Sequence, residues 1–316
     1  MLSEKLLALV EGATDLKKIS IGRLISLFEN SHTDAIASRR AVIEYLEQKQ
    51  LTAGKIIGFT GTPGAGKSTL IGELALGLIQ SNPKNSVAVL AVDPSSQITG
   101  GAFLGDRTRV NFPAKEKRLF FRSQASNCEF GGVSFNTFQV VRVLRYFFSH
   151  VFIETVGIGQ TEIEIQKLAQ HTCLVMQPLA GDQIQFMKSG IMEIPDTFIV
   201  NKCDEEALAK RSYHLLKSSL NQAKLLQTQK QHLFMTSALK KTGVDQLLQH
   251  IEGIEVSSDG FSSQESFYLE KWFQEEYGRH GFQLLNKSGI EQLSQLPGGF
   301  EEKQDQLRQH ISKYFG

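Results

Sequence analysis

The chain has 316 residues, with 34 Lys and Arg against 33 Asp and Glu, so its formal net charge is +1. A chain of this length forms one large domain or two modest ones, and it buries a core without disulfides or structural metal ions. The balanced charge argues against a protein that binds nucleic acid or acidic membranes through bulk charge. About half of the 27 glycines lie between Gly54 and Gly159, which predicts tight turns or close approach to a ligand there.

The cysteines and the hydropathy pattern favour the cytoplasm. Cys128, Cys173 and Cys203 are far apart and form no metal-binding or redox motif, as expected for reduced thiols. The N-terminal apolar run from Leu6 to Val10 is short and flanked by acidic residues, unlike a secretory signal. No stretch approaches the roughly 18 apolar residues of a membrane-spanning helix. We therefore expect a cytoplasmic protein without a membrane segment.

The first 50 residues show helical spacing. Leu6, Leu7 and Val10 form one apolar face, and a second lies within residues 21–28. We expect a helical arm over residues 1–50.

From Lys55 the pattern changes to continuous apolar runs of strand length, separated by turns or helical stretches. Strands buried on both faces have this pattern, so it predicts a mostly parallel sheet covered by helices on both sides. The expected strands are KIIGFT, SVAVLAV, RLFFR, VFIETV, CLVMQ, TFIVNK and HLFMTS. The expected helices between them include residues 134–148, 161–170, 183–193 and 205–228. The fold class is α/β, a doubly wound P-loop NTPase sheet over residues 51–256.

Beyond this region the rhythm of strands stops. Apolar residues return to helical spacing between Phe267 and Tyr277, and again between Leu307 and Phe315. This predicts a helical C-terminal extension over residues 257–316.

A glycine-rich loop follows the first expected strand and precedes a helical stripe. Residues 61–68 read GTPGAGKS, which matches the phosphate-binding pattern G-x-x-x-x-G-K-[ST]. Its glycines let backbone N–H groups turn toward phosphate oxygens, and the following helix adds its N-terminal donors. We expect Lys67 to bind the outer phosphates and the Ser68 hydroxyl to coordinate Mg²⁺.

The stretch TFIVNKCD predicts recognition of guanine. It places Asn201, Lys202 and Asp204 at the carboxyl end of a strand, the edge where parallel sheets bind ligands. N-K-x-D is the guanine-reading signature of P-loop GTPases. The Asp204 carboxylate can accept two hydrogen bonds from guanine, whereas adenine offers no such pair of donors. We expect Lys202 to lie along the base plane and Asn201 to tie loops together.

A second base-contacting loop is expected after the last strand. Thr236, Ser237 and Ala238 resemble this loop, and the backbone amides of Ala238 and Leu239 would meet guanine O6. The alternative for N-K-x-D alone is a solvated polar turn, but its order behind a phosphate loop favours a base site.

Two acidic residues lie at strand ends between these motifs. Asp93 follows SVAVLAV, and Glu154 lies in VFIETV with Gly157 three residues further on. Each acid can complete the Mg²⁺ shell or orient the attacking water, because a buried carboxylate that faces a polyphosphate is costly without a cation. Helix capping is the alternative role.

Together these motifs resemble the MeaB/ArgK GTPases (the methylmalonic aciduria type A family), which are accessory proteins of adenosylcobalamin-dependent acyl-CoA mutases. The segments that carry the likeness are GFTGTPGAGKSTL, VDPSSQITGGAFLGDRTRV, ETVGIGQTE and GIMEIPDTFIVNKCD. The resemblance implies a chaperone that binds GTP or GDP with Mg²⁺, hydrolyses GTP slowly, and gates cofactor loading into the mutase or protects it. It also implies a homodimer formed partly through the C-terminal extension.

The resemblance also implies roles for individual residues. It assigns catalysis to Lys67, Asp93 and Glu154, and the metal site to Ser68, Asp93, Asp106 and Glu154. Residues 157–160 would form the second switch, and residues 181–190 a third that reports the nucleotide state to the mutase. The implied nucleotide contacts are Gly64, Ala65, Gly66, Lys67, Ser68, Thr69, Gly157, Asn201, Lys202, Asp204, Ser237, Ala238 and Leu239.

The sequence departs from the family pattern near the third switch and in one loop. Leu179 replaces a usual glycine, Gln183 replaces a usual acid, and SQASNCEFGG over residues 123–132 replaces a glycine-rich loop. The nucleotide-binding core is retained, and these changes lie in regions expected to contact the partner.

Three other interpretations stay open. A transport-type ATPase or protein kinase would need a base for a protein hydroxyl, and no candidate stands out beyond the acids above. A metal-insertion GTPase usually carries paired Cys and His ligands, whereas the eight histidines here are scattered, His150, His171 and His214 among them. A non-enzymatic scaffold is compatible with slow hydrolysis, for which Arg107 and Arg109 are the candidate charge stabilisers.

Overall fold

The structure is a computed structural model of the chain. It describes residues 2–30, 32–93, 112–113, 115–125, 133–155, 160–178, 195–222, 231–255, 261–287 and 293–315. The chain divides into two compact units. The sheet unit comprises Ala53–Thr137 and Leu144–Val256, and the helical unit comprises Met1–Thr52, Phe138–Val143 and Ser257–Gly316. No helix in the described ranges combines the length and apolar character needed to cross a membrane.

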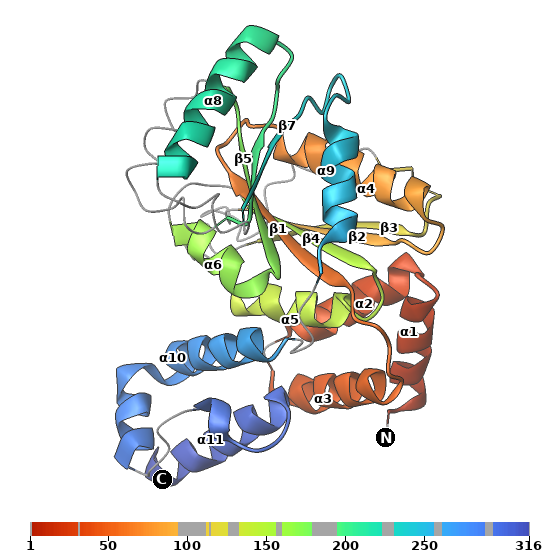
Figure 1. The fold of residues 1–316 in the computed structure, drawn as a ribbon. Coiled ribbons are helices and arrows are strands. Elements are labelled where there is room, and N and C mark those ends of the chain that lie inside the picture. The colour runs from red at the N-terminus through yellow and green to blue at the C-terminus, as the bar shows by residue number, and fades with distance from the viewer. Residues whose placement is uncertain are drawn as a thin grey trace. The chain divides into compact units, whose positions relative to one another are not determined.

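The sheet unit contains seven parallel strands in the order β3-β2-β4-β1-β5-β6-β7 (Figure 1). Each predicted apolar run corresponds to one of these strands, so the predicted parallel α/β fold is confirmed. Because all strands run the same way, their carboxyl ends meet at one edge and their amino ends at the other. The strands are β1 Lys55–Gly61, β2 Val87–Asp93, β3 Leu119–Ala125, β4 His150–Thr155, β5 His171–Met176, β6 Thr197–Val200 and β7 His232–Met235.

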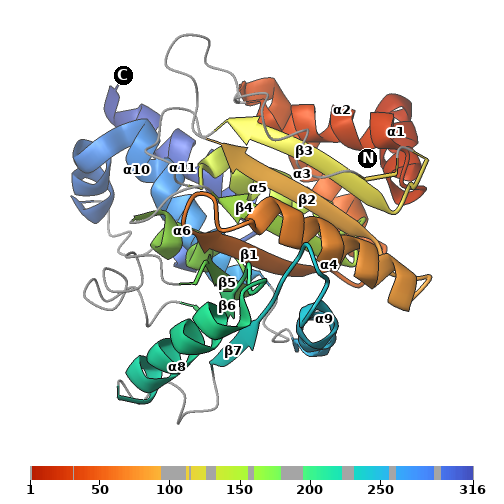
Figure 2. The same cartoon turned by 90° about the horizontal axis from the view of Figure 1, so that it is seen from above.

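Helices cover both faces of this sheet. Figure 2 shows α4 and α9 on one face and α6 and α8 on the other. Ile57 and Phe59 of β1 pack in the core beneath α4 and α9, whereas Leu174 and Met176 of β5 pack in the core beneath α8. Burial on both faces explains why the strands are continuously apolar rather than alternating. These helices are α4 Lys67–Ser81, α6 Gln160–Leu168, α8 Glu206–Gln222 and α9 Val244–Gly253.

The predicted helices agree with the structure where it describes them. The prediction over residues 134–148 corresponds to α5 Phe135–Leu144, and that over 161–170 corresponds to α6. The helix predicted over residues 205–228 is α8, whose described part ends at Gln222. The helix predicted over residues 183–193 lies outside the described residues.

The helical unit joins the two ends of the chain. The predicted N-terminal arm forms three helices and the predicted C-terminal extension forms two long ones, and α11 packs against both α3 and α10. Gly278 interrupts α10 with φ 58° and ψ −161°, a conformation that favours glycine. The helices are α1 Glu4–Thr14, α2 Lys18–Glu29, α3 Thr33–Gln48, α10 Ser262–Lys287 and α11 Phe300–Phe315, with a 3₁₀ turn at Leu293–Gln295.

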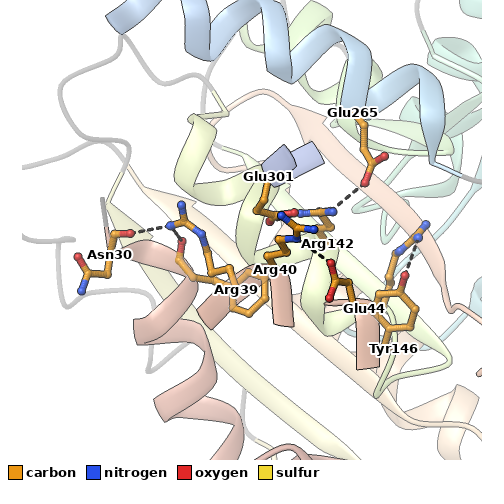
Figure 3. A network of polar contacts seen from close by, with 10 residues as sticks. Asn30, Arg39, Arg40, Glu44, Arg142, Tyr146, Glu265 and Glu301 are labelled. Carbon is orange, nitrogen blue, oxygen red and sulfur yellow. Dashed lines mark hydrogen bonds and ion pairs between the residues drawn. The ribbon is translucent and has the colours of Figure 1, made fainter. Parts of the chain in front are cut away.

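A buried polar network holds the helical unit together (Figure 3). Arg142 donates from Nε to Glu265 at 2.8 Å and from Nη1 to Glu301, and the side chains of Arg142 and Glu301 are each only 3% exposed. Beside it, Phe138 stacks on Tyr268 with ring centroids 4.5 Å apart. Since a buried charge is costly without its partner, these contacts fix α5, α10 and α11 to one another.

Candidate nucleotide-binding site

The phosphate loop connects β1 to α4 at the carboxyl edge of the sheet. Gly61 has φ 133°, and a Cβ there would lie 1.9 Å from the Val175 carbonyl oxygen. Gly64 and Gly66 have φ values of 77° and 82°, and a Cβ on Gly66 would lie 2.7 Å from Asn201 Nδ2. Residues with side chains rarely adopt this conformation, so the loop depends on glycine. Helix α4 begins directly after it and supplies N-terminal N–H donors.

A pocket of about 420 Å³ opens over this loop. Lys67 lies in it and is 5% exposed, and its Nζ donates to the carbonyl oxygens of Gly61 at 2.9 Å and Thr62 at 3.0 Å. These bonds hold the ammonium group over the loop, where its charge and the positive end of α4 attract an anion. The pocket is lined by Pro63, Gly64, Gly66, Lys67, Ser68, Thr69, Glu154 and Lys202.

Two predicted magnesium ligands lie side by side at this pocket. Ser68 Oγ donates to Glu154 Oε1 at 2.7 Å. Glu154 is 4% exposed and is placed by β4, which pairs with β1 so that Phe59 and Glu154 are in register. Hydroxyl and carboxylate oxygens are the ligand types that Mg²⁺ prefers, so the residues present fit this ion.

Asn201 links the phosphate loop to the predicted base loop. Its Nδ2 donates to the Ala65 carbonyl oxygen at 2.9 Å, and its Oδ1 accepts from Thr236 Oγ1 at 3.0 Å and from the Ala238 amide at 3.2 Å. Asn201 itself is 1% exposed. One buried amide group therefore fixes the spacing between the loop for phosphates and the loop for the base.

The two stretches predicted to read guanine are bonded to each other. Asp204 Oδ1 accepts from Ser237 Oγ at 2.6 Å, and the Asp204 carbonyl oxygen accepts from Lys240 Nζ at 2.9 Å. Lys202 has φ 62° and lines the phosphate pocket, and Leu239 is 82% exposed beside these residues. The bond from Ser237 thus holds the Asp204 carboxylate against the predicted base loop.

The structure describes only part of the predicted switch machinery. Asp93 is the last residue of β2, next to β4, but its side chain lies outside the description. The altered loop at 123–132 is described only to residue 125, the end of β3. Outside the described residues lie Asp106, Arg107, Arg109, Gly157, Leu179, Gln183 and the segment 181–190.

Histidines expected to be scattered are in part gathered by the fold. His171, His232 and His250 lie with Thr197 at the amino edge of the sheet, opposite the phosphate loop. In the ranges that the structure describes, no group of three or more His, Cys, Asp or Glu is arranged to hold a metal ion. The sequence did contain a signal, because His232 begins the expected strand HLFMTS and His171 lies two residues before the expected strand CLVMQ, and the starts of parallel strands share one edge.

The chain resembles a family of known GTPases over most of its length. The family described as Methylmalonyl Co-A mutase-associated GTPase MeaB matches residues 21–265. A Pyrococcus horikoshii relative is 41% identical over 193 residues, which cover 59% of this chain and 57% of that protein. GTPase ArgK of Escherichia coli K12 is 37% identical over 200 residues, which cover 60% of this chain and 58% of that protein. The chain thus spans under three fifths of the length of these curated relatives.

A solved structure shares the fold. The structure of a LAO/AO transport system kinase superposes with a TM-score of 0.64 and 22% sequence identity, and the match covers 99% of both chains. Identity at this level shows the P-loop fold alone.

Proposed function

The chain belongs to the MeaB family of methylmalonyl-CoA mutase-associated GTPases, and we propose that it binds GTP and GDP with Mg²⁺ and hydrolyses GTP slowly. Its proposed role is that of a cytoplasmic chaperone which gates cofactor loading into an adenosylcobalamin-dependent acyl-CoA mutase, or protects that enzyme. The observation that carries the nucleotide part is the link from the Ala65 carbonyl through Asn201 to Ala238, because it sets a phosphate loop and a base loop in one site.

In the proposed site, phosphate binding begins with Lys67. Its ammonium group and the N–H groups at the start of α4 would bind the β- and γ-phosphates. Ser68 and Glu154 would hold Mg²⁺, with Asp93 and Asp106 completing its shell or orienting water. The ion supplies positive charge that neutralises the phosphate oxygens. The backbone at Gly157 would report the presence of the γ-phosphate.

Guanine selectivity is proposed to depend on Asp204. Its carboxylate would accept two hydrogen bonds from guanine, while the backbone amides after Ser237 would donate to guanine O6. Adenine would leave the carboxylate without these donors, and an unpaired polar group in a binding site is strongly disfavoured. The bond from Ser237 Oγ supports this role because it orients the Asp204 carboxylate before the base arrives.

The family description supports a mutase as the protein partner. A homodimer through the C-terminal extension is part of the same proposal. The transport kinase alternative rests on a likeness that bears on the fold alone. The metal-insertion alternative gains no support from the described residues, among which no group of three or more His, Cys, Asp or Glu is arranged to hold a metal ion.

Isothermal titration tests the nucleotide proposal. With Mg²⁺ present, we expect GTP and GDP to bind at least about 100-fold more tightly than ATP, the discrimination typical of a site built around a polar partner. Equal affinity for ATP would contradict a guanine site.

Size-exclusion chromatography with a methylmalonyl-CoA mutase from the same organism tests the partner. We expect a complex whose stability differs between GDP and a non-hydrolysable GTP analogue. No complex in either nucleotide state would contradict the chaperone role and leave the nucleotide proposal to the titration.

A further inference from the structure

The edge of the sheet opposite the phosphate loop carries a row of polar strand starts. Five of the seven strands begin with a polar or titratable residue. Three of these side chains are buried, since His150 is 4% exposed, His171 is 9% exposed and Thr197 is fully buried. The residues that begin these strands are Lys55, His150, His171, Thr197 and His232.

One hydroxyl group at this edge is shared by two imidazoles. Thr197 Oγ1 lies 2.8 Å from His171 Nε2 and 3.0 Å from His250 Nε2. The rings of His171 and His250 have centroids 5.5 Å apart, and the ring of the exposed His232 lies 4.2 Å from that of His250. We call His171, Thr197, His232 and His250 the histidine cluster.

Neutral rings let the shared hydroxyl of this cluster act as both a donor and an acceptor. A hydroxyl has one proton, so Thr197 can donate to one imidazole nitrogen and accept from the other. A proton added to the accepting nitrogen removes the bond that the hydroxyl donates to it, so the hydroxyl can then only accept. It also places a positive charge beside another imidazole in a partly buried cluster.

Other charged groups around the cluster do not relieve this cost. Burial lowers the pKa of His171 and His250 to about 4, and His232 adds to the shift. Asp196, just before β6, accepts from the Thr172 amide at 2.8 Å, and burial raises the pKa of its carboxyl group. Burial also raises the pKa of the Cys173 thiol.

Along the same edge lies a second buried imidazole, from β4. Burial lowers the pKa of His150 to about 4, with a further contribution from the Lys55 ammonium group. Lys55 Nζ donates to the Glu252 carbonyl oxygen at 2.6 Å, and the Glu252 carboxylate accepts from Ser81 Oγ and Asn85 Nδ2. The Glu252 charge is thus already engaged at the end of α9.

The elements that carry the histidine cluster also carry the predicted base site. Thr197 begins β6, and Asn201 follows its last residue. His232 begins β7, and Thr236 follows its last residue. His250 lies in the last turn of α9, whose first residue follows the base loop. We call β6, β7 and α9 together the base-carrying edge. Strands β6 and β7 have four residues each and span only about 13 Å, at about 3.3 Å per residue, so the histidine cluster at one end and the base loops at the other are closely connected.

We propose that the histidine cluster is a proton-sensitive support for this base-carrying edge, so that acidification opens β6, β7 and α9 and weakens guanine nucleotide binding. In the opened edge the imidazoles of His171 and His250 reach water and take up protons, whereas in the closed edge a proton would sit in a buried site and remove the bond that Thr197 donates. Acid therefore favours opening. β7 is a terminal strand of the described sheet and pairs with β6 alone there, so its opening breaks the pairing with one strand only.

Binding of GDP across a pH range tests this inference, which rests on the proposed guanine site. The proteins are the wild type, the double variant His171→Gln with His250→Gln, and the control His214→Gln on the exposed face of α8. Glutamine keeps an N–H donor for Thr197 but takes up no proton. From pH 7.5 to 5.0 we expect the dissociation constant of the wild type and of the control to rise about tenfold more than that of the double variant. The titration of GDP itself is common to all three proteins and cancels.

Equal pH dependence in all three proteins would overturn the proposal. Hydrogen exchange of the wild type at pH 7.5, 6.0 and 5.0 provides a second test that needs no variant and no nucleotide. After correction for intrinsic exchange rates, we expect protection in residues 198–200, 233–235 and 244–251 to fall more than in β1 and β4. A uniform change would overturn the proposal. If the protein failed to bind GDP at any pH but hydrogen exchange still showed selective opening of β6, β7 and α9, the guanine site would be contradicted and the proton-sensitive support would not.

Discussion

The two edges of the parallel sheet both carry polar groups, but these groups border an open pocket at one edge and bond to one another at the other. At the carboxyl edge, Lys67, Ser68 and Glu154 border a pocket of about 420 Å³ that suits a charged ligand. At the amino edge, His171 and His250 bond to one hydroxyl and form a closed cluster. Both edges contain buried titratable side chains, so burial alone does not identify a ligand site. The difference is that the carboxyl edge opens where loop backbone and the start of α4 supply further donors.

The largest expected effect comes from the carboxyl edge. Lys67→Ala should weaken GTP binding by about 100-fold or more, because it removes the ammonium group held over the phosphate loop by Gly61 and Thr62. Isothermal titration measures the loss, and circular dichroism checks the fold. The matched control is Lys84→Ala at an exposed lysine beyond the end of α4, which should bind GTP normally. Tight binding by Lys67→Ala would contradict the assignment of the pocket.

The next effect separates the base loop from the phosphate loop. Asp204→Asn should reduce the preference for GTP over ATP by about 10- to 100-fold, because an amide cannot accept both guanine donors. The bond from Ser237 can be kept, so the fold should change little. Competition between GTP and ATP against a fluorescent nucleotide measures the preference. Unchanged selectivity would remove Asp204 from the base site.

The carboxyl edge was predictable because its residues lie in contiguous motifs. Residues 61–68 and Asn201–Asp204 each carry their chemistry within a few positions, and predicted strand ends brought Glu154 to the same edge. The links from Asn201 to Ala65 and from Ser68 to Glu154 followed from that topology.

The amino edge was not predicted, although part of it was within reach. His150, His171 and His232 are first residues of parallel strands, which places them along one edge. The contact of His250 with Thr197 depends on how α9 packs on the sheet, and no local pattern encodes that packing. For the same reason the joining of the N-terminal arm and the C-terminal extension in one unit could not be foreseen, since it depends on contacts between distant segments such as α3 with α11 and Arg40 with Glu302.

Acid should act on the amino edge through its histidines. The pKa values of His150, His171 and His250 are lowered in the folded protein to about 4 from 6.5. Below pH 6.5 the unfolded chain binds protons that the folded chain does not. The free energy of unfolding should therefore be fully retained above about pH 6.5 and fall progressively toward pH 4.

Urea unfolding at pH 7.5, 6.0 and 5.0 measures this loss of stability. The exposed His214 provides the comparison, because His214→Gln should leave the pH dependence unchanged. Replacing His171 with Gln should make the dependence shallower. A stability that stays constant from pH 7.5 to 5.0 would show that these imidazoles are protonated in the folded chain as readily as in water.

The smallest expected effect isolates the shared hydroxyl. Thr197→Val keeps the shape of the side chain but removes Oγ1, so the imidazole nitrogens of His171 and His250 lose their shared partner, at a cost of about 1–3 kcal/mol in the free energy of unfolding. Thr197→Ser retains the hydroxyl and loses only a methyl group, so it should retain most of the stability that Thr197→Val loses. Because the carboxyl edge is untouched, the loss of GTP affinity at pH 7.5 should be far smaller than in Lys67→Ala. If Thr197→Val instead abolished GTP binding at neutral pH while its unfolding curve stayed unchanged, the amino edge would belong to the nucleotide site and the contrast between the two edges would be wrong.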